Sequence, residues 1–393
     1  MVVRGKRRYT AAVLAAVLIL AAAVPAHGTR KRERAQPPQE TGFLNRTLTL
    51  HGVVYKYQVY LPAEWRRDDG RRWPIILFLH GRGERGVEGM WQTQIGLPEA
   101  VRDHPERWPF IIVMPQCPQT HFWTDPEALT VAMESLDQMT AEFHADVERT
   151  YLTGLSLGGY GAWELAKNHP QRWAAVAIAA GGIFWSYEPE RWKEQNILLP
   201  EYARAVGKLP IWLFHGTDDT TVLPKQSELL FEAVKAAGGH VRLWEYQGLK
   251  HDCWTRAYNE PELPRWLLEH KGGRKPEPPL FAANEKMVIP LHPPEMKLPL
   301  QLLDEFTGEY GEGDKEPPVM IYRQGDGLYY KNQTGVVTPL GAESTTTFYF
   351  ESASQARVIF ERDTAGKVTG FVLKDDRSET RWELVKALPR TMN

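Results

Sequence analysis

A serine between two glycines, in the stretch Gly154 to Gly158, is the part of the chain best suited to chemistry. An apolar, β-prone run enters it from Val147, and helix-forming residues leave it toward Asn168. A turn this tight between a strand and a helix admits only small residues at the two glycines, and it raises the serine hydroxyl above the edge of the sheet. The positive end of the following helix points at that hydroxyl. The pattern predicts that Ser156 is a catalytic nucleophile, and a glycine-rich turn without catalysis is the alternative.

A serine hydroxyl needs a base that takes its proton and an acid that orients the base. After a turn of this kind the acid and the histidine follow the serine in that order. The buried run 211–215 ends in a polar turn, where we expect Asp219 to be the acid and keep Asp218 as the competing choice. His251 follows the apolar run 241–246 and is the predicted base. A solvated loop histidine is the alternative for His251.

Acyl transfer also needs backbone N–H groups that stabilise the negatively charged oxygen of the intermediate. We expect one from Leu157, directly after the nucleophile, and one from Arg82 in the glycine-rich loop 80–86. A phosphate-binding loop is the alternative, but this stretch lacks the Gly-Lys-Ser/Thr ending of such loops. His80 and His215 also end predicted strands and precede glycines. Because they lie upstream of the acid or beside it, we interpret both as structural.

The elements that must position these residues alternate along the chain. Runs that are apolar throughout, as at 74–80, 110–114 and 174–180, are typical of strands buried on both faces. Apolar residues at helical spacing predict helices over 128–147 and 224–237. Alternating strands and helices predict an α/β fold with a mostly parallel sheet and helices on both faces. Ligands bind at the C-terminal ends of the strands in such sheets.

Aromatic residues near these strand ends are candidates for contact with a substrate. Trp123, Trp185 and Trp254 are the ones we expect to form an aromatic wall that stacks on a ring of the substrate. Trp185 belongs to a long connection, 182–210, whose aromatic content suits a lid or a wall of the site. Packing in the core is the alternative for all three residues.

The chain divides into segments of different composition. Residues 1–26 carry a basic start, an apolar stretch and a small-residue cleavage site, which predict an export signal, and 27–41 form a polar spacer. The catalytic domain is expected over 42–270. Seven prolines then predict a stiff linker over 271–299. Short segments of period two predict a small antiparallel β-barrel or sandwich over 300–390.

The composition limits the cellular location and the partners. The export signal predicts a secreted or periplasmic protein with no stable membrane span in its mature form. The basic stretch 30–32 behind the cleavage site keeps an uncleaved anchor as the alternative. A net charge of −2 implies no nucleic-acid partner. After export, Cys117 and Cys253 could pair or remain two free buried thiols, and the sequence leaves this open.

Residues 42–270 resemble secreted α/β-hydrolases of the feruloyl esterase, acetyl xylan esterase and polyhydroxybutyrate depolymerase group, which are similar to prolyl-oligopeptidase-like esterases. The resemblance rests on Phe78 to Gly86, Pro115 to Pro118, Gly154 to Gly161, His215 to Asp219 and His251 to Trp254. It implies a Ser156–Asp219–His251 triad, an oxyanion hole from Arg82 and Leu157, and no cofactor or metal. The last segment, from its opening Leu303 to Tyr310, resembles a lipocalin-like β-domain that follows some serine hydrolases.

Together these features predict an exported serine carboxylesterase. The substrate could be a feruloyl or acetyl ester of plant polysaccharide, or an ester of the polyhydroxyalkanoate type. We expect the β-domain to serve self-association or the holding of a polymeric substrate. A serine peptidase of the same fold is one alternative, and a catalytically weak polymer-binding protein is another. A complete triad in the expected order argues against the latter.

Overall fold

The computed structural model describes residues 40–185, 189–272, 281–282, 284–312, 317–350, 353–375 and 378–388. The predicted export signal, and all of the predicted spacer except its last two residues, lie outside these ranges. None of the helices in the described ranges combines the length and the hydropathy that crossing a bilayer requires.

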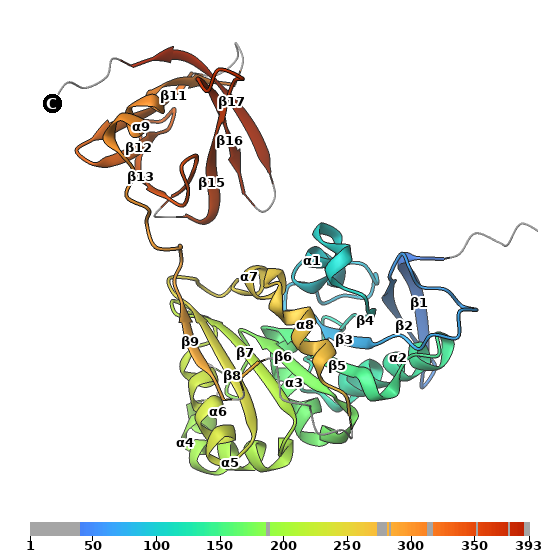
Figure 1. Ribbon diagram of the computed structural model, residues 1–393. Coiled ribbons are helices and arrows are strands. Elements are labelled where there is room, and N and C mark those ends of the chain that lie inside the picture. The colour runs from blue at the N-terminus through green and yellow to red at the C-terminus, as the bar shows by residue number, and fades with distance from the viewer. Residues whose placement is uncertain are drawn as a thin grey trace, which may run out of the picture. The chain divides into compact units, whose positions relative to one another are not determined.

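A nine-stranded sheet forms the first part of the structure, in the order β1-β2-β4-β3-β5-β6-β7-β8-β9 (Figure 1). β1 and β2 form an antiparallel hairpin, β2 is antiparallel to β4, and all later neighbours are parallel. The strands are β1 (Gly42–Leu50), β2 (Val53–Leu61), β3 (Ile75–Leu79), β4 (Ile111–Pro115), β5 (Thr150–Leu155), β6 (Ala175–Ala179), β7 (Pro210–Gly216), β8 (His240–Tyr246) and β9 (Lys286–Ile289). The predicted, mostly parallel α/β sheet is confirmed.

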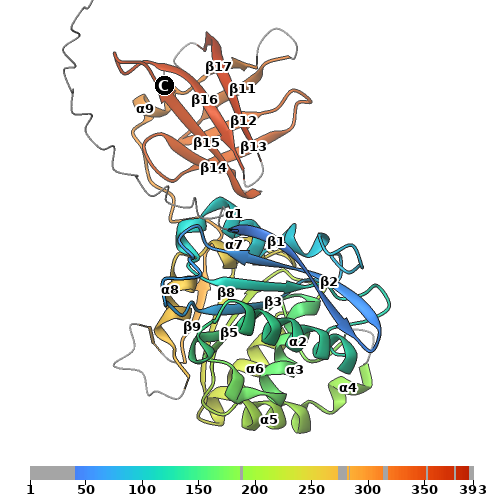
Figure 2. The same cartoon turned by 90° about the vertical axis from the view of Figure 1, so that its right-hand side faces the viewer.

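Helices cover both faces of this sheet (Figures 1 and 2). The helices are α1 (Leu97–Asp103), α2 (Pro126–Glu142), α3 (Leu157–Asn168), α4 (Pro189–Lys193), α5 (Gln195–Val206), α6 (Lys225–Ala236), α7 (Trp254–Asn259) and α8 (Glu262–Glu269). α2, α3, α5 and α6 share one hydrophobic core with the sheet, and α1, α7 and α8 share the other.

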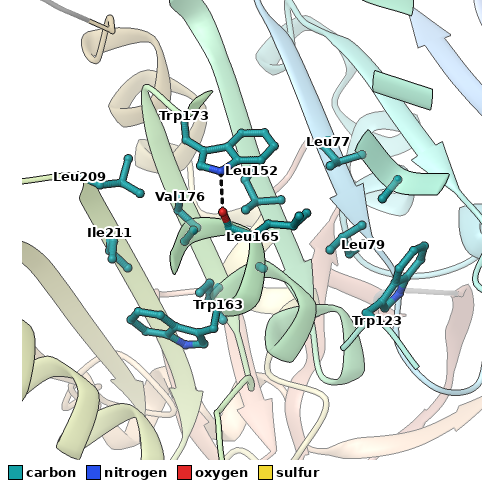
Figure 3. Packing of buried hydrophobic residues seen from close by; sticks show 14 of the residues in the cluster. Leu77, Leu79, Trp123, Leu152, Trp163, Leu165, Trp173, Val176, Leu209 and Ile211 are labelled. Carbon is teal, nitrogen blue, oxygen red and sulfur yellow. Dashed lines mark hydrogen bonds between the residues drawn. The ribbon is translucent and has the colours of Figure 1, made fainter. Parts of the chain in front are cut away.

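Strand β3 explains why the central strands are apolar throughout. Ile75, Leu77 and Leu79 point into the core on the side of α3, while Ile76 and Phe78 point into the opposite core. Successive side chains of a strand alternate between faces, so a strand between two cores has no solvent-facing position. Figure 3 shows Leu77 and Leu79 in the first core, together with Leu152, Val176 and Ile211 from neighbouring strands.

The C-terminal part is a closed antiparallel barrel of eight strands, which settles the alternative between barrel and sandwich. A short helix, α9 (Leu300–Glu305), precedes it. Aromatic side chains, among them Phe306, Phe348, Phe360 and Phe371, fill the interior. The strands are β10 (Gly308–Gly311), β11 (Val319–Gln324), β12 (Gly327–Lys331), β13 (Val337–Ala342), β14 (Thr347–Phe350), β15 (Ala353–Arg362), β16 (Val368–Lys374) and β17 (Glu379–Ala387).

The prediction of a linker over the whole of 271–299 is wrong at residues 286–289. These residues form β9, which pairs in parallel with β8 at the edge of the sheet. Lys286 lies 3.1 Å from the buried Glu245, and Arg242 of β8 pairs with Glu285 at 2.5 Å. The segment Lys-Met-Val-Ile has the composition of a strand, but the prolines on both sides of it favour a linker, so the sequence did not predict a strand here.

The extra strand sets where the chain can be shortened. A chain ending after Leu291 keeps β9, and we expect it to hydrolyse a small ester with a kcat/KM within about twofold of the full-length value. A chain ending at Pro279 loses β9 and leaves Arg242 without Glu285. We expect it to unfold at least about 5 °C lower, the shift for a loss of about 2 kcal/mol.

The measurements are thermal unfolding and kcat/KM on a nitrophenyl ester for the three chain lengths. Loss of activity in a folded chain ending at Leu291 would mean that the barrel contributes to the active site.

Candidate active site

Ser156 lies at the junction of β5 and α3, in a backbone conformation that non-glycine residues rarely adopt (φ 50°, ψ −116°). Such a conformation costs about 1–3 kcal/mol and persists only where the surroundings impose it. Here the surroundings are two glycines. A Cβ at Gly154 would overlap the carbonyl of Gly158, and a Cβ at Gly158 would overlap the carbonyl of Leu79. The close approach of α3 to β3 and β5 therefore requires both glycines and lifts the serine side chain out of the turn.

Ser156, His251 and Asp219 lie in a single line of hydrogen bonds. Ser156 Oγ is 2.8 Å from His251 Nε2, and His251 Nδ1 is 2.7 Å from Asp219 Oδ2. The carboxylate can only accept, so Nδ1 carries a proton, and Nε2 of the neutral ring accepts from the serine hydroxyl. This is the arrangement in which a histidine can take the proton of a nucleophile.

The carboxyl of Asp219 is fully buried and accepts several hydrogen bonds. Its Oδ1 accepts from the backbone N–H groups of Thr221 (2.8 Å) and Val222 (2.9 Å). Burial raises the pKa of a carboxyl, but hydrogen bonds from His215 and His251 and from the backbone outweigh it and hold the pKa of Asp219 well below its usual range. Asp219 therefore stays ionised at neutral and mildly acidic pH.

The competing choice for the acid, Asp218, lies on the outside of the same turn. It is exposed, and among the described residues its carboxylate bonds only to the hydroxyl of Thr217. The structure therefore brings Asp219, and not Asp218, to His251.

The loops that carry the acid and the histidine are packed backbone against backbone. A Cβ at Gly216 would overlap the carbonyls of Leu249 and Lys250. The N–H of Asp218 donates to the carbonyl of Leu249 at 2.9 Å, and the N–H of Gly248 donates to Thr217 Oγ1 at 2.8 Å. These contacts fix the separation of the two loops, and with it the distance from acid to histidine.

The loop after β3, residues 80–86, lies beside Ser156, where the predicted oxyanion hole would have to be. A Cβ built at Gly81 would be 3.7 Å from Cβ of Ser156. Arg82 follows Gly81, and Leu157 is the first residue of α3, whose N–H has no acceptor within the helix. In the described part of the chain, neither the Arg82 N–H nor the Leu157 N–H has a hydrogen-bond acceptor. Neither predicted donor is therefore engaged by another group, as an oxyanion hole would require.

His80 ties this loop to the loop after β4. Its Nδ1 donates to the carbonyl of Gly81 (2.7 Å), and its Nε2 accepts from the N–H of Cys117 (2.9 Å). Trp123 donates its indole N–H to the carbonyl of His80 at 3.0 Å. Because the ring is fully buried and Nε2 must remain an acceptor, burial lowers the pKa of His80 to about 4.

The depressed pKa of His80 makes stability depend on pH. The unfolded chain takes up a proton below about pH 6.5, whereas the folded chain does so only near pH 4, so stability falls as the pH drops through this range. Between pH 7 and pH 5 the free energy of unfolding should fall by about 2 kcal/mol. We expect His80→Gln, which keeps an acceptor for Cys117 but does not titrate, to be less stable at pH 7 and to lack this loss.

Urea unfolding between pH 7 and 5, followed by tryptophan fluorescence, measures this difference. All tryptophans except Trp382 precede residue 271, so the signal reports on the first part of the chain. Equal pH slopes for wild type and variant would contradict the role given to His80.

The prediction that Trp123 contacts substrate is not supported, because its side chain is completely buried. It packs beside Leu79 in the core shared with α3 (Figure 3), and its indole N–H bonds to His80 of the loop 80–86. A Cβ at Gly161 of α3 would lie only 2.5 Å from Cβ of Trp123, so the helix and the indole are in close contact. A sequence pattern cannot distinguish an indole facing the substrate from one packed beneath the loop.

The other two predicted tryptophans are partly exposed. Trp254 meets the ring of His251 edge to face, with the ring centroids 5.2 Å apart. Trp185 stacks on Tyr160 of α3 at 3.9 Å and contacts Phe122 at 5.8 Å. Arg85 of the loop 80–86 lies over Phe122 at 5.0 Å. An aromatic row, Tyr160–Trp185–Phe122, therefore runs from α3 to the loop 80–86.

Gln226, which the sequence did not single out, binds Tyr160 of this row and the backbone just before Trp185. Its Oε1 accepts from the N–H groups of Ile183 and Phe184, and its Nε2 donates to Phe184 O and to Tyr160 Oη. A lone glutamine in a helix pattern carries no signal of such a role. Phe122 was also missed, because a phenylalanine in a loop carries no signal of its contacts.

Cys117 and Cys253 are both free and buried. Burial raises the pKa of each thiol, that of Cys117 to about 12, so neither is a reactive thiolate at neutral pH. The question left open by the sequence is answered in favour of two buried thiols.

Comparison with known proteins agrees with this geometry. Residues 51–260 match the family described as "Putative esterase". Feruloyl esterase B of Thermothelomyces thermophilus is 25% identical over 214 residues, which cover 47% of this chain and 72% of that protein. Dipeptidyl-peptidase 5 of Porphyromonas gingivalis is 24% identical over 214 residues, and the chain spans only 30% of its length.

Among solved structures, a thermostable esterase is similar at a TM-score of 0.50 with 29% identity. The similarity covers 58% of this chain and 63% of that one. The match to the family model includes the nucleophile turn, the acid loop and the histidine loop and extends over more than half of the chain. The chain belongs to this esterase family.

Proposed function

We propose that the chain is an exported serine carboxylesterase that works through an acyl-enzyme. The observation that carries the proposal is the line of hydrogen bonds from Ser156 Oγ through His251 to the buried Asp219, at 2.8 and 2.7 Å. A strained turn presents the serine, and two backbone N–H groups are available beside it. Family membership and the similarity to a feruloyl esterase support ester hydrolysis.

The first half of the reaction forms the acyl-enzyme. His251 Nε2 takes the proton of Ser156 as Oγ attacks the ester carbonyl carbon, and the carbonyl oxygen becomes an oxyanion. The N–H groups of Leu157 and Arg82 stabilise that oxyanion. Asp219 stabilises the imidazolium without taking its proton. The imidazolium then gives the proton to the leaving alcohol as the ester C–O bond breaks.

Water hydrolyses the acyl-enzyme by the same route. His251 removes a proton from water, hydroxide adds to the acyl carbon, and collapse of the intermediate releases the acid and returns the proton to Ser156 Oγ. No cofactor is needed for either half, since the proton and the electron pairs move among substrate, serine and histidine alone.

For the substrate we propose an ester that brings a planar ring or a sugar to Trp185 and Trp254. Feruloyl and acetyl esters of plant polysaccharide carry such a group and are the first candidates. Polyhydroxyalkanoate-type esters, which carry neither a planar ring nor a sugar, are the remaining candidate. Trp254 contacts the ring of His251, and Trp185 stacks on Tyr160 in the first turns of α3. Partly exposed rings in these places suit such groups because rings stack on them. A serine peptidase is the second candidate, favoured by the similarity to a dipeptidyl-peptidase.

The test combines a probe with a substrate panel. A fluorophosphonate probe should label wild type but not Ser156→Ala. The panel should contain methyl ferulate, acetylated xylan, a hydroxybutyrate oligomer and dipeptide anilides. Turnover of anilides faster than of every ester would overturn the carboxylesterase in favour of the peptidase. Absence of both labelling and turnover would overturn the catalytic function altogether.

Export and the role of the barrel are part of the same proposal. The signal predicted over 1–26 should be removed, so the mature chain found outside the cytoplasm should begin near residue 27. If the barrel holds a polymeric substrate, the full-length protein should co-sediment with insoluble polymer and the chain ending at Leu291 should not. If the barrel serves self-association, only the full-length protein should form oligomers. Mass spectrometry and sedimentation measure these outcomes.

A further inference from the structure

His215, at the end of β7, is a second histidine in contact with the acid Asp219. Its side chain is completely buried. Its Nε2 lies 2.8 Å from the carbonyl oxygen of Val222 and 3.2 Å from Asp219 Oδ2, and its Nδ1 lies 2.7 Å from Ser227 Oγ. Both ring nitrogens therefore have partners, and one of those partners belongs to the candidate triad.

The partners fix which nitrogen carries the proton. A carbonyl oxygen and an ionised carboxylate only accept hydrogen bonds, so Nε2 of His215 is the donor to both. Nδ1 of the neutral ring is then an acceptor, and the hydroxyl of Ser227 on α6 donates a hydrogen bond to it. The ring cannot turn over without breaking all three contacts.

The oxygen of Asp219 that faces His251 is thus shared by two imidazoles. Oδ2 accepts from His251 Nδ1 at 2.7 Å and from His215 Nε2 at 3.2 Å. Oδ1 is held by two backbone N–H groups in the same turn. Together these bonds restrict rotation of the carboxylate. The hydrogen bond from His215 also stabilises part of the negative charge on Oδ2, which weakens the interaction of that charge with His251.

We propose that His215 is a positioning residue for catalysis, which holds Oδ2 of Asp219 toward His251 and moderates the basicity that the acid gives to that histidine. The proposal rests on the proposed serine mechanism. It assigns to His215 no contact with substrate. His215 is held in turn by Ser227 of α6. The same helix carries Gln226, which bonds to Tyr160, so α6 orients both the acid and one ring of the aromatic row.

Two substitutions distinguish the role of the N–H donor at Nε2 from that of the rest of the imidazole ring. A glutamine amide can reach the position of Nε2, while the shorter asparagine reaches only the position of Nδ1. We expect His215→Asn to lower kcat by at least about tenfold with KM within about twofold, the effect of losing a buried hydrogen bond of about 1–3 kcal/mol. His215→Gln should keep kcat within about threefold of wild type.

The pH profile gives a readout that a purely structural role would not change. Without the donor from His215, Asp219 places more of its charge on His251 and stabilises the imidazolium. The acid limb of kcat/KM should therefore move to higher pH in His215→Asn and stay in place in His215→Gln. The exposed His169, changed to Asn, is the matched control and should leave both quantities unchanged.

Three outcomes would overturn the proposal. One is a folded His215→Asn with wild-type kcat and acid limb. Another is a loss of kcat with an unshifted acid limb and a lowered melting temperature, which would mark a structural role only. If His215→Asn does not fold, His215→Gln carries the test: it keeps the donor at Nε2, so a shifted acid limb or a kcat more than tenfold lower in the folded His215→Gln would overturn the proposal. A failure of the serine mechanism is distinguished by a separate measurement, because a fluorophosphonate would then not label the wild-type protein.

Discussion

Ser156→Ala should lower kcat on nitrophenyl esters by at least about 10³ while the protein stays folded. The variant keeps the backbone turn and the oxyanion donors but has no atom to attack the ester. In the described part of the chain the only hydrogen-bond partner of the serine side chain is His251. Stability should therefore change by less than about 0.5 kcal/mol.

The measurements are a kinetic assay with an active-site titration, thermal unfolding, and labelling by a fluorophosphonate. The matched control is Ser135→Ala, which removes the hydroxyl of a buried serine of α2 away from the turn. That variant should keep its activity. A Ser156→Ala protein with a tenth of wild-type activity would remove Ser156 from the role of nucleophile.

The candidate triad could be predicted because each of its members carries a local signal. Gly154 and Gly158 mark a turn that only small residues permit, and Asp219 and His251 each follow an apolar strand in the order that the nucleophile turn requires. The structure brings the three side chains into one line of hydrogen bonds. Their catalytic roles stay predictions until the variants are measured.

The supports of the site could not be predicted, because they depend on contacts between distant segments. His80 contacts Cys117, His215 contacts Ser227 and Gln226 contacts Phe184, each across a different loop or helix. None of these pairs leaves a pattern in a single sequence. Trp123 is the opposite case, a residue that the sequence suggested for substrate contact but that the structure places in the core.

Two strands of the barrel, β10 and β13, have compositions that do not mark them as strands in the sequence. β13 contains Pro339 and Gly341, and β10 begins and ends with glycine, so their composition is that of turns. Both pair on two sides in a closed barrel, where the neighbouring strands supply the stability that local propensity lacks. β9 was hidden among prolines in the same way.

The choice between the two neighbouring acids leads to the second large effect. Asp219→Asn should lower kcat by about 10³ to 10⁴, whereas Asp218→Asn should stay within about threefold of wild type. Asp218 is exposed, and its side chain bonds to Thr217 rather than to His251. Kinetics of both variants on the same ester, with thermal unfolding as the control for folding, give the ranking. The reverse ranking would make Asp218 the acid.

The size of the Asp219→Asn effect follows from how the carboxyl is held. The N–H groups of Thr221 and Val222 require an acceptor at the position of Oδ1, so the amide oxygen of an asparagine must take that place. Its NH₂ group then replaces Oδ2 and donates toward His251 Nδ1, which becomes the acceptor. The remaining proton of the neutral ring moves to Nε2, and the histidine can no longer accept the proton of Ser156. Rising pH cannot restore this acceptor, so the loss should persist across the alkaline range, and recovery of activity there would contradict the assigned orientation.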